Sequence, residues 1–328
     1  MNRPRRGHIA IAAVYLGLSL SLTSFHAFQV NFGPKEEVRA QRHTRIVAME
    51  EGLSPWAYRV AVPIAVERRI EPALRTIGVD PEESREYAYL VVRFAATWLT
   101  LLLSHALIRR FTSDQMALGG TLLIGALHGP SIEHYWFQPA SGPDHVLWLT
   151  TALLALSKRD AWVYAVVFLG AFNRETIVFA IPIYLALRWG TEEYRRTLER
   201  TFVMGLLWLL PFIWLRGVVE LRYSLTPTVH EYAWQNFTNF EWQFYAFAFA
   251  GAWGVVPLLG WRLLPRPLRA LMCMMVPYLA LVLAFGRIRE VRLLLPTTVA
   301  FVPAAMVVLN AWLKQDTKHP LRETSGPS

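Results

Sequence analysis

Apolar residues in this chain are grouped in long blocks separated by short polar segments. A helix of about 20 apolar residues spans the hydrocarbon core of a bilayer, because each residue adds about 1.5 Å to its length. The pattern therefore predicts an all-α fold, a polytopic transmembrane helical bundle of about ten spans. The first span covers residues 8–30, and the others lie near residues 86–108, 114–129, 144–157, 161–172, 176–188, 200–217, 242–261, 269–286 and 291–313.

The two short blocks between residues 161 and 188 allow a second interpretation. They also fit a pair of half-helices or a re-entrant hairpin, in place of two full spans. In either form we expect one integral membrane domain, residues 1–328. It divides into the span 8–30, an outer loop 31–85, the remaining spans within 86–313 and a tail 314–328.

The outer loop, residues 31–85, has the pattern of short amphipathic helices. Ser54-Pro55 is typical of a helix start, and Pro63 and Pro72 divide the rest of the loop into short pieces. Apolar residues recur there at helical spacing opposite charged ones, as Val66, Ile70, Ala73, Leu74 and Ile77. We expect these helices to lie flat on the membrane surface.

Composition agrees with a membrane protein. Hydrophobic residues make up 54% of the chain and charged residues only 17%, which excludes an ordinary soluble enzyme or a disordered chain. A net charge of +9 fits anionic lipid headgroups or phosphate better than nucleic acid, since no soluble basic domain is predicted. The single cysteine, Cys273, excludes an intramolecular disulfide.

Basic residues predict the orientation. Arg3, Arg5 and Arg6 precede the first span, so the N-terminus is expected in the cytoplasm. If ten spans cross the membrane in alternating directions, the C-terminal tail and further basic groups fall on the same side as the N-terminus. These groups include Arg109-Arg110, Lys158-Arg159, Arg195-Arg196, Arg262 and Lys314. The prediction is a multi-pass protein of the cell (inner) membrane with both termini cytoplasmic, whose loops with mixed polar chemistry face outward.

Carboxylates in the first outer loop are candidate general bases. Glu36 and Glu37 follow the first span closely, and Glu51 closes a polar stretch later in the loop. A second interpretation is that these groups are solvated charges balancing Arg39, Arg42 and Arg45.

Two arginine-rich clusters also fall on outward loops. One is Asn173-Arg174-Glu175, and the other runs from Arg287 to Arg292 and contains Arg289 and Glu290. Charge at a membrane edge is costly unless it is paired, and the planar guanidinium fork suits phosphate. The clusters fit either an anion-binding site or a structural network of arginines and glutamates.

Asp144 and His145 begin a predicted span on the outer side. We interpret them as a further polar part of the site, or as a cap on that helix. Nearby His128, Glu133 and His134 match no metal-ligand spacing, so no metal site is expected, and no cofactor is indicated.

This arrangement resembles the GT-C superfamily, polytopic glycosyltransferases that use a polyprenyl-phosphate-linked sugar at the outer membrane face. The shared features are an anchor with a cytoplasmic N-terminus, acidic residues soon after it, flat helices in the first loop and many short-looped spans. Segments at Tyr58–Pro63, Asn173–Thr176 and Arg289–Leu293 also look like uncharacterised bacterial proteins of this type. GT-C enzymes usually carry an aspartate-containing motif after the first span, where this chain has Glu36-Glu37.

The resemblance implies roles for these residues. Glu36 or Glu37, then Glu51 or Asp144, would accept the proton of the acceptor hydroxyl. Arginines would stabilise the leaving lipid phosphate, namely Arg59, Arg174, Arg287 and Arg289, with Glu175, Glu290 and His145 completing the binding site. The main rival is a membrane transporter or flippase, and a third possibility is a non-catalytic subunit of a membrane assembly.

Overall fold

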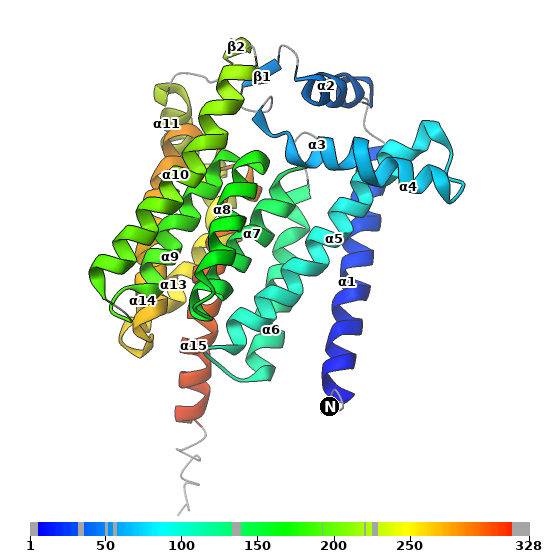
Figure 1. Ribbon diagram of the computed structural model, residues 1–328. Coiled ribbons are helices and arrows are strands. Elements are labelled where there is room, and N and C mark those ends of the chain that lie inside the picture. Colours follow the sequence, from blue (N-terminus) through cyan, green and yellow to red (C-terminus); the bar gives the residue numbers. More distant parts are fainter. Residues whose placement is uncertain are drawn as a thin grey trace, which may run out of the picture.

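Long helices run side by side through the computed structural model (Figure 1). The structure describes residues 6–31, 36–49, 52–54, 58–132, 139–191, 193–219, 221–224 and 229–316. The helices of the bundle are α1 (Arg6–Asn31), α5 (Pro81–Arg109), α6 (Asp114–His128), α7 (Ser141–Leu156), α8 (Asp160–Asn173), α9 (Ala180–Arg188), α10 (Tyr194–Val218), α12 (Phe240–Ala246), α13 (Ala252–Leu259), α14 (Arg266–Phe285) and α15 (Thr298–Asp316).

Short helical segments join or extend these helices. A π-helical turn η6 (Phe247–Gly251) links α12 to α13, and α11 (Val229–Thr238) precedes them. The 3-10 helices are η3 (Pro130–Ile132), η5 (Glu175–Phe179), η7 (Trp261–Leu263), η8 (Val291–Leu293) and η9 (Leu295–Thr297).

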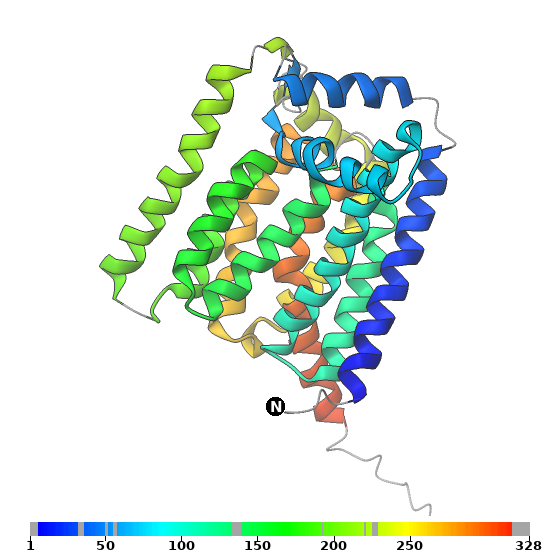
Figure 2. The same ribbon diagram turned by 45° about the vertical axis from the view of Figure 1, so that its right-hand side comes forward.

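Several helices of the first loop lie across one end of the bundle (Figure 2). They are α2 (Glu36–Ala48), α3 (Ala61–Ala65), the π-helix η2 (Val66–Ile70) and α4 (Glu71–Thr76). Strand β1 (Gly52–Ser54) pairs in parallel with β2 (Leu221–Ser224), so the described part of the chain is all-helical apart from one short strand pair that the sequence did not predict. That pair fastens the first loop to the segment after α10. The prediction of a helix start at Ser54 was wrong, because Ser54 is the last residue of β1 and α3 begins at Ala61.

Six helical segments in the described part of the chain are long and apolar enough to cross a membrane. They are Ile9–Phe28, Pro81–Arg109, Tyr194–Val218, Phe240–Leu259, Arg266–Phe285 and Val291–Lys314. The other predicted spans fall on α6, α7, α8 and η5 with α9, whose helices have 15, 16, 14, five and nine residues. A helix of 15 residues extends only about 22 Å, so six segments have the length and composition of a membrane span and the count of ten stays a prediction.

The short pair at 161–188 forms an antiparallel hairpin. Helix α8 starts at Asp160, whose carboxylate accepts a hydrogen bond from Tyr184 at 2.9 Å and lies 3.7 Å from Nη2 of Arg188 at the end of α9. The turn between them is at Arg174, at the opposite end of the bundle. Close packing in this hairpin requires Gly170, because a Cβ there would stand 2.6 Å from Cγ1 of Ile177.

A continuous apolar core joins α7, α8, α9, α14 and α15. Trp148 is fully buried at its centre, with its ring 5.0 Å from that of Tyr278. The outer helices instead expose large apolar side chains, such as Phe202, Leu210 and Ile213 on α10. An exposed apolar surface on a membrane-length helix is suited to contact with lipid.

The two ends of the bundle differ in chemistry. One end, here called the polar end, carries α2, α3, η2, α4, the strand pair and the connections α8–α9 and α14–α15 (Figures 1 and 2). The opposite end, here called the basic end, carries the connections α5–α6, α7–α8, α9–α10 and α13–α14, with the start of α1 and the end of α15. The sequence therefore predicts correctly which connections share an end.

Candidate functional site

The candidate site is built at the polar end around the turn between α8 and η5. Helix α8 ends because Arg174 adopts an extended backbone, with φ −162° and ψ 139°, and the 3-10 helix η5 begins at the next residue. Asn173 and Arg174 are each 3% exposed. The turn therefore places a buried amide and a buried guanidinium side by side at the polar end.

Arg59, from the first loop, reaches this turn. Its Nη2 lies 2.6 Å from Oε1 of Glu175, and its Nε donates to Oε2 at 3.4 Å. Burial by itself would raise the pKa of Glu175, but the charge and hydrogen bond of Arg59 outweigh it and lower that pKa to about 2. Glu175 is thus an ionised partner of Arg59, unsuited to accept a proton.

Arg216, near the end of α10, lies beside this pair. Its guanidinium carbon is 3.4 Å from the ring centre of Phe212 and 4.3 Å from that of Tyr58, a stacking that favours a cation. Arg216 also interacts electrostatically with Glu175 and is exposed. The site therefore has an exposed cation at its edge.

Asp144, at the start of α7, faces Arg174 from the other side. Its Oδ2 accepts a hydrogen bond from Thr176 at 2.9 Å and lies 3.6 Å from Nη1 of Arg174, which also donates to Oγ of Ser141 at 3.4 Å. Asp144 is fully buried. Oδ1 of Asp144, Oδ1 of Asn173 and Nε of Arg174 are buried and have no hydrogen-bond partner among the residues that the structure describes.

The second arginine cluster contributes through Arg292 and Glu290. These two side chains form an ion pair, and Arg292 is 4% exposed. Arg174 interacts electrostatically with Glu290 and with Arg292. The sequence instead favoured Arg287 and Arg289, but both side chains are exposed, and Arg287 stacks on the ring of Tyr232 at 4.9 Å.

His145 belongs to a separate buried group, although it is the neighbour of Asp144 in the chain. Its Nε2 lies 3.0 Å from Oγ1 of Thr298, whose hydroxyl donates to the carbonyl of Leu295, so the imidazole donates to Thr298. Its Nδ1 lies 3.4 Å from Nε2 of His128, and the two rings are stacked at 5.5 Å. These contacts tie α6, α7 and α15 together.

The first-loop carboxylates proposed as bases, Glu36, Glu37 and Glu51, have side chains outside the described residues. Helix α2 begins at Glu36, and it is the end of this helix that leads to β1 and the segment with Arg59 (Figure 2). A helix of 13 residues is about 18 Å long between its first and last residues. The side chains of Glu36 and Glu37 lie outside the described residues, as does Glu51.

Sequence reasoning identified the two loops of the site but missed several of its members. Ser141, Asn173, Thr176 and Arg292 were not assigned roles, although each lies within three residues of one that was. The available signal was a polar residue directly beside a predicted helix end. With Arg216 added, four arginines face the three carboxylates of Asp144, Glu175 and Glu290, so the site retains one positive charge for an anion.

No known protein family, curated protein or solved structure matches the chain.

Proposed function

We propose that the protein is a membrane glycosyltransferase that moves a sugar from a polyprenyl-phosphate donor to an acceptor at the outer face of the cell membrane. The observation that carries the proposal is the set of three unpartnered buried atoms at the polar end, Oδ1 of Asp144, Oδ1 of Asn173 and Nε of Arg174. A buried polar atom without a partner costs about 1–3 kcal/mol, so a ligand that supplied the missing hydrogen bonds would bind favourably at this cluster.

A sugar has the complementary chemistry. Two of the three atoms are acceptors and one is a donor. Neighbouring hydroxyl groups donate and accept hydrogen bonds at the same time, so they can satisfy Asp144, Asn173 and Arg174 together.

A lipid phosphate fits the surrounding charge. Arg59, Arg174 and Arg292 are buried and Arg216 is exposed, against three carboxylates. A guanidinium fork binds phosphate oxygens, and it stabilises negative charge most strongly where water is scarce. The apolar helices below this end would hold the polyprenyl chain, and the helices of the first loop would lie on the membrane surface.

Asp144 is the described carboxylate best suited to act as the base. Thr176 and Arg174 hold its Oδ2, which leaves Oδ1 free. In the proposed reaction, the acceptor hydroxyl oxygen attacks the anomeric carbon while its proton passes to Oδ1 of Asp144. The bond from the anomeric carbon to the phosphate oxygen breaks, and the lipid phosphate leaves as an anion beside Arg174. Glu36 and Glu37 are the alternative bases.

The test is sugar transfer by the purified full chain from a panel of polyprenyl-phosphate sugars. A general base contributes about 10²–10⁴-fold to the rate, so Asp144→Asn should lower transfer by that factor while the donor still binds. Asp114→Asn is the matched control, because Asp114 is an exposed carboxylate at the basic end.

Other results would redirect the proposal. Loss of transfer in Glu36→Gln or Glu37→Gln, with Asp144→Asn unaffected, would assign the base to the first loop. If the wild-type chain binds the donor lipid and moves it across vesicle membranes without transfer, it is a transporter or flippase. If it neither binds nor transfers any donor in the panel, the glycosyltransferase proposal is wrong and a non-catalytic subunit becomes the better interpretation.

A further inference from the structure

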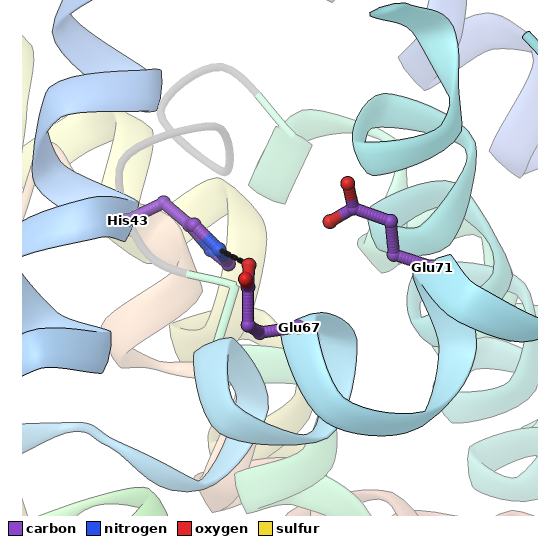
Figure 3. A group of neighbouring side chains, drawn as sticks. All are labelled: His43, Glu67 and Glu71. Atoms are coloured by element: carbon purple, nitrogen blue, oxygen red, sulfur yellow. Dashed lines mark hydrogen bonds and ion pairs between the residues drawn. The ribbon is translucent and has the colours of Figure 1, made fainter. Parts of the chain in front are cut away.

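A second polar group lies at the polar end, on the helices of the first loop. His43 on α2 faces Glu67 on η2 and Glu71 at the start of α4 (Figure 3). One potential ligand atom from each residue lies within 4.8 Å of the other two. His43 and Glu71 are each 3% exposed, whereas the Glu67 side chain is 40% exposed.

Each buried ligand already has a partner on the atom that would not bind an ion. His43 Nδ1 lies 2.7 Å from the hydroxyl of Tyr89, which leaves Nε2 directed at Glu67, 2.8 Å away. Glu71 is held through Oε1 by Arg75 and by Ser84, the latter at 3.4 Å. Metal-binding histidines and carboxylates typically have such supporting hydrogen bonds, which fix their orientation.

We propose that His43, Glu67 and Glu71 bind a divalent transition-metal ion of the zinc class, with water completing its coordination. One imidazole nitrogen and two carboxylate oxygens suit Zn²⁺ and its neighbours in the first transition row. Glu67 and Glu71 are four residues apart on one helical face, and His43 comes from a different helix. The ion would therefore fasten α2 to the helices beneath it.

Binding requires two local changes. The Nε2 proton that His43 shares with Glu67 leaves, and Nδ1 then carries the proton donated to Tyr89. Arg85, whose Nε lies 3.4 Å from Oε2 of Glu71, gives way to the ion. The side chain of Arg85 is 34% exposed, so it can turn toward solvent at little cost, and the exposed Glu67 gives the ion a path in.

The site could not be found from the sequence, because 24 positions separate His43 from Glu67. It is independent of the arginine site: its ligands belong to α2, η2 and α4, whereas the arginine site is built from α7, α8, η5, α10, η8 and the segments before α3 and η8. Failure of one proposal would leave the other unaffected.

The experiment is Zn²⁺ titration of the purified, tag-free full chain by calorimetry, with X-ray absorption spectroscopy of the loaded wild-type protein. We expect one equivalent of Zn²⁺ bound by oxygen and nitrogen, including a single imidazole. Glu67→Gln should weaken binding at least tenfold, and Tyr89→Phe, which removes only the supporting hydroxyl, should weaken it about 10–100-fold. Glu82→Gln, an exposed carboxylate at the same end, should bind Zn²⁺ like the wild type.

Three results would overturn the proposal. The first is a wild-type chain that binds no stoichiometric Zn²⁺. The second is a spectrum with sulfur or several imidazoles around the ion. The third is unchanged affinity in both Glu67→Gln and Tyr89→Phe. Because the spectroscopy uses wild-type protein, the proposal can be rejected even if a variant fails to fold.

Discussion

Arg59 and Glu175 are 116 positions apart and form a two-point ion pair, with Nη2–Oε1 at 2.6 Å and Nε–Oε2 at 3.4 Å. The pair joins the first loop to the turn after α8. Beside it, Trp208 on α10 donates its indole N–H to the carbonyl of Glu175 at 3.2 Å, so three distant segments meet at one residue. Glu175 therefore contacts the first loop and α10 from its place in the hairpin.

Loss of Arg59 should destabilise the protein in a pH-dependent way. The folded-state pKa of Glu175, about 2, lies below its ordinary value of 4.5, so the pair stabilises the fold fully above about pH 4.5 and less as the pH falls toward 2. In Arg59→Met the carboxylate of Glu175 has lost its partner. The loss of unfolding free energy at pH 7 should approach, but not reach, the ~3–5 kcal/mol of fully buried pairs, since the Glu175 side chain is 27% exposed.

Unfolding of the detergent-solubilised protein between pH 7 and pH 3 measures this. The difference in unfolding free energy between the wild type and Arg59→Met should become smaller as the pH falls below 4.5, because Glu175 then becomes neutral in the variant. Arg195→Met removes an exposed pair with Glu199 and should cost at most ~1 kcal/mol. A difference in unfolding free energy between the wild type and Arg59→Met that does not change with pH would argue against the ionised pair.

Replacing Arg174 by lysine should lower sugar transfer by about 10²-fold, the effect of losing one donor to a developing negative charge. Lysine keeps the charge but loses the planar fork, so the amount of folded protein should stay near that of the wild type. The measurement is the transfer rate together with the yield of monodisperse protein.

Arg289→Lys is the informative comparison for that variant. Arg289 was a sequence-based candidate for the same role, but its side chain is exposed. We expect a much smaller effect than for Arg174→Lys. Equal losses in the two variants would mean that the exposed arginines bind the phosphate, and loss of folded protein in Arg174→Lys would favour a structural network.

Asn236→Ala should destabilise the polar end. The side chain of Asn236 is 1% exposed and donates to the carbonyls of Leu283 and Gly286, at 2.8 and 2.7 Å, while it accepts from the N–H of Ile288 at 3.1 Å. Removing it leaves buried backbone groups unpaired, at a cost of about 1–3 kcal/mol. Thermal unfolding should show this loss, with Asn239→Ala, a helix cap, as the milder comparison.

Cysteine labelling should distinguish the two ends of the bundle. After replacement of Cys273 by serine, cysteines at the exposed positions Glu82 and Trp234 on the polar end should react with a membrane-impermeant thiol reagent added to intact cells. Cysteines at the exposed positions Thr191 and Arg262 should react only after permeabilisation. The reverse pattern would invert the orientation, and labelling of all four from outside would contradict a membrane bundle.

The sequence by itself determined the helices and which connections share an end. In a membrane, the backbone N–H and C=O groups of such an apolar block are satisfied by the hydrogen bonds within a helix. Because successive spans run in opposite directions, their order sets the end of the bundle at which each loop emerges. Arg174 and the cluster from Arg287 to Arg292 were therefore expected together, and both lie at the polar end. Local pattern also predicted helices in the first loop, because helical spacing is a property of neighbouring residues.

Only the tertiary structure decided which polar side chains meet and which face outward. Arg292 is buried and Arg289 exposed because Arg289 lies in the hydrogen-bonded turn before η8, whereas Arg292 lies in η8 itself. A charge pattern does not encode this difference. Asp144 faces Arg174 while its neighbour His145 faces Thr298, because adjacent residues on a helix point about 100° apart. The pairing of His43 with Glu67 and of β1 with β2 depends on contacts between distant segments, whose energies arise only when the whole chain has packed.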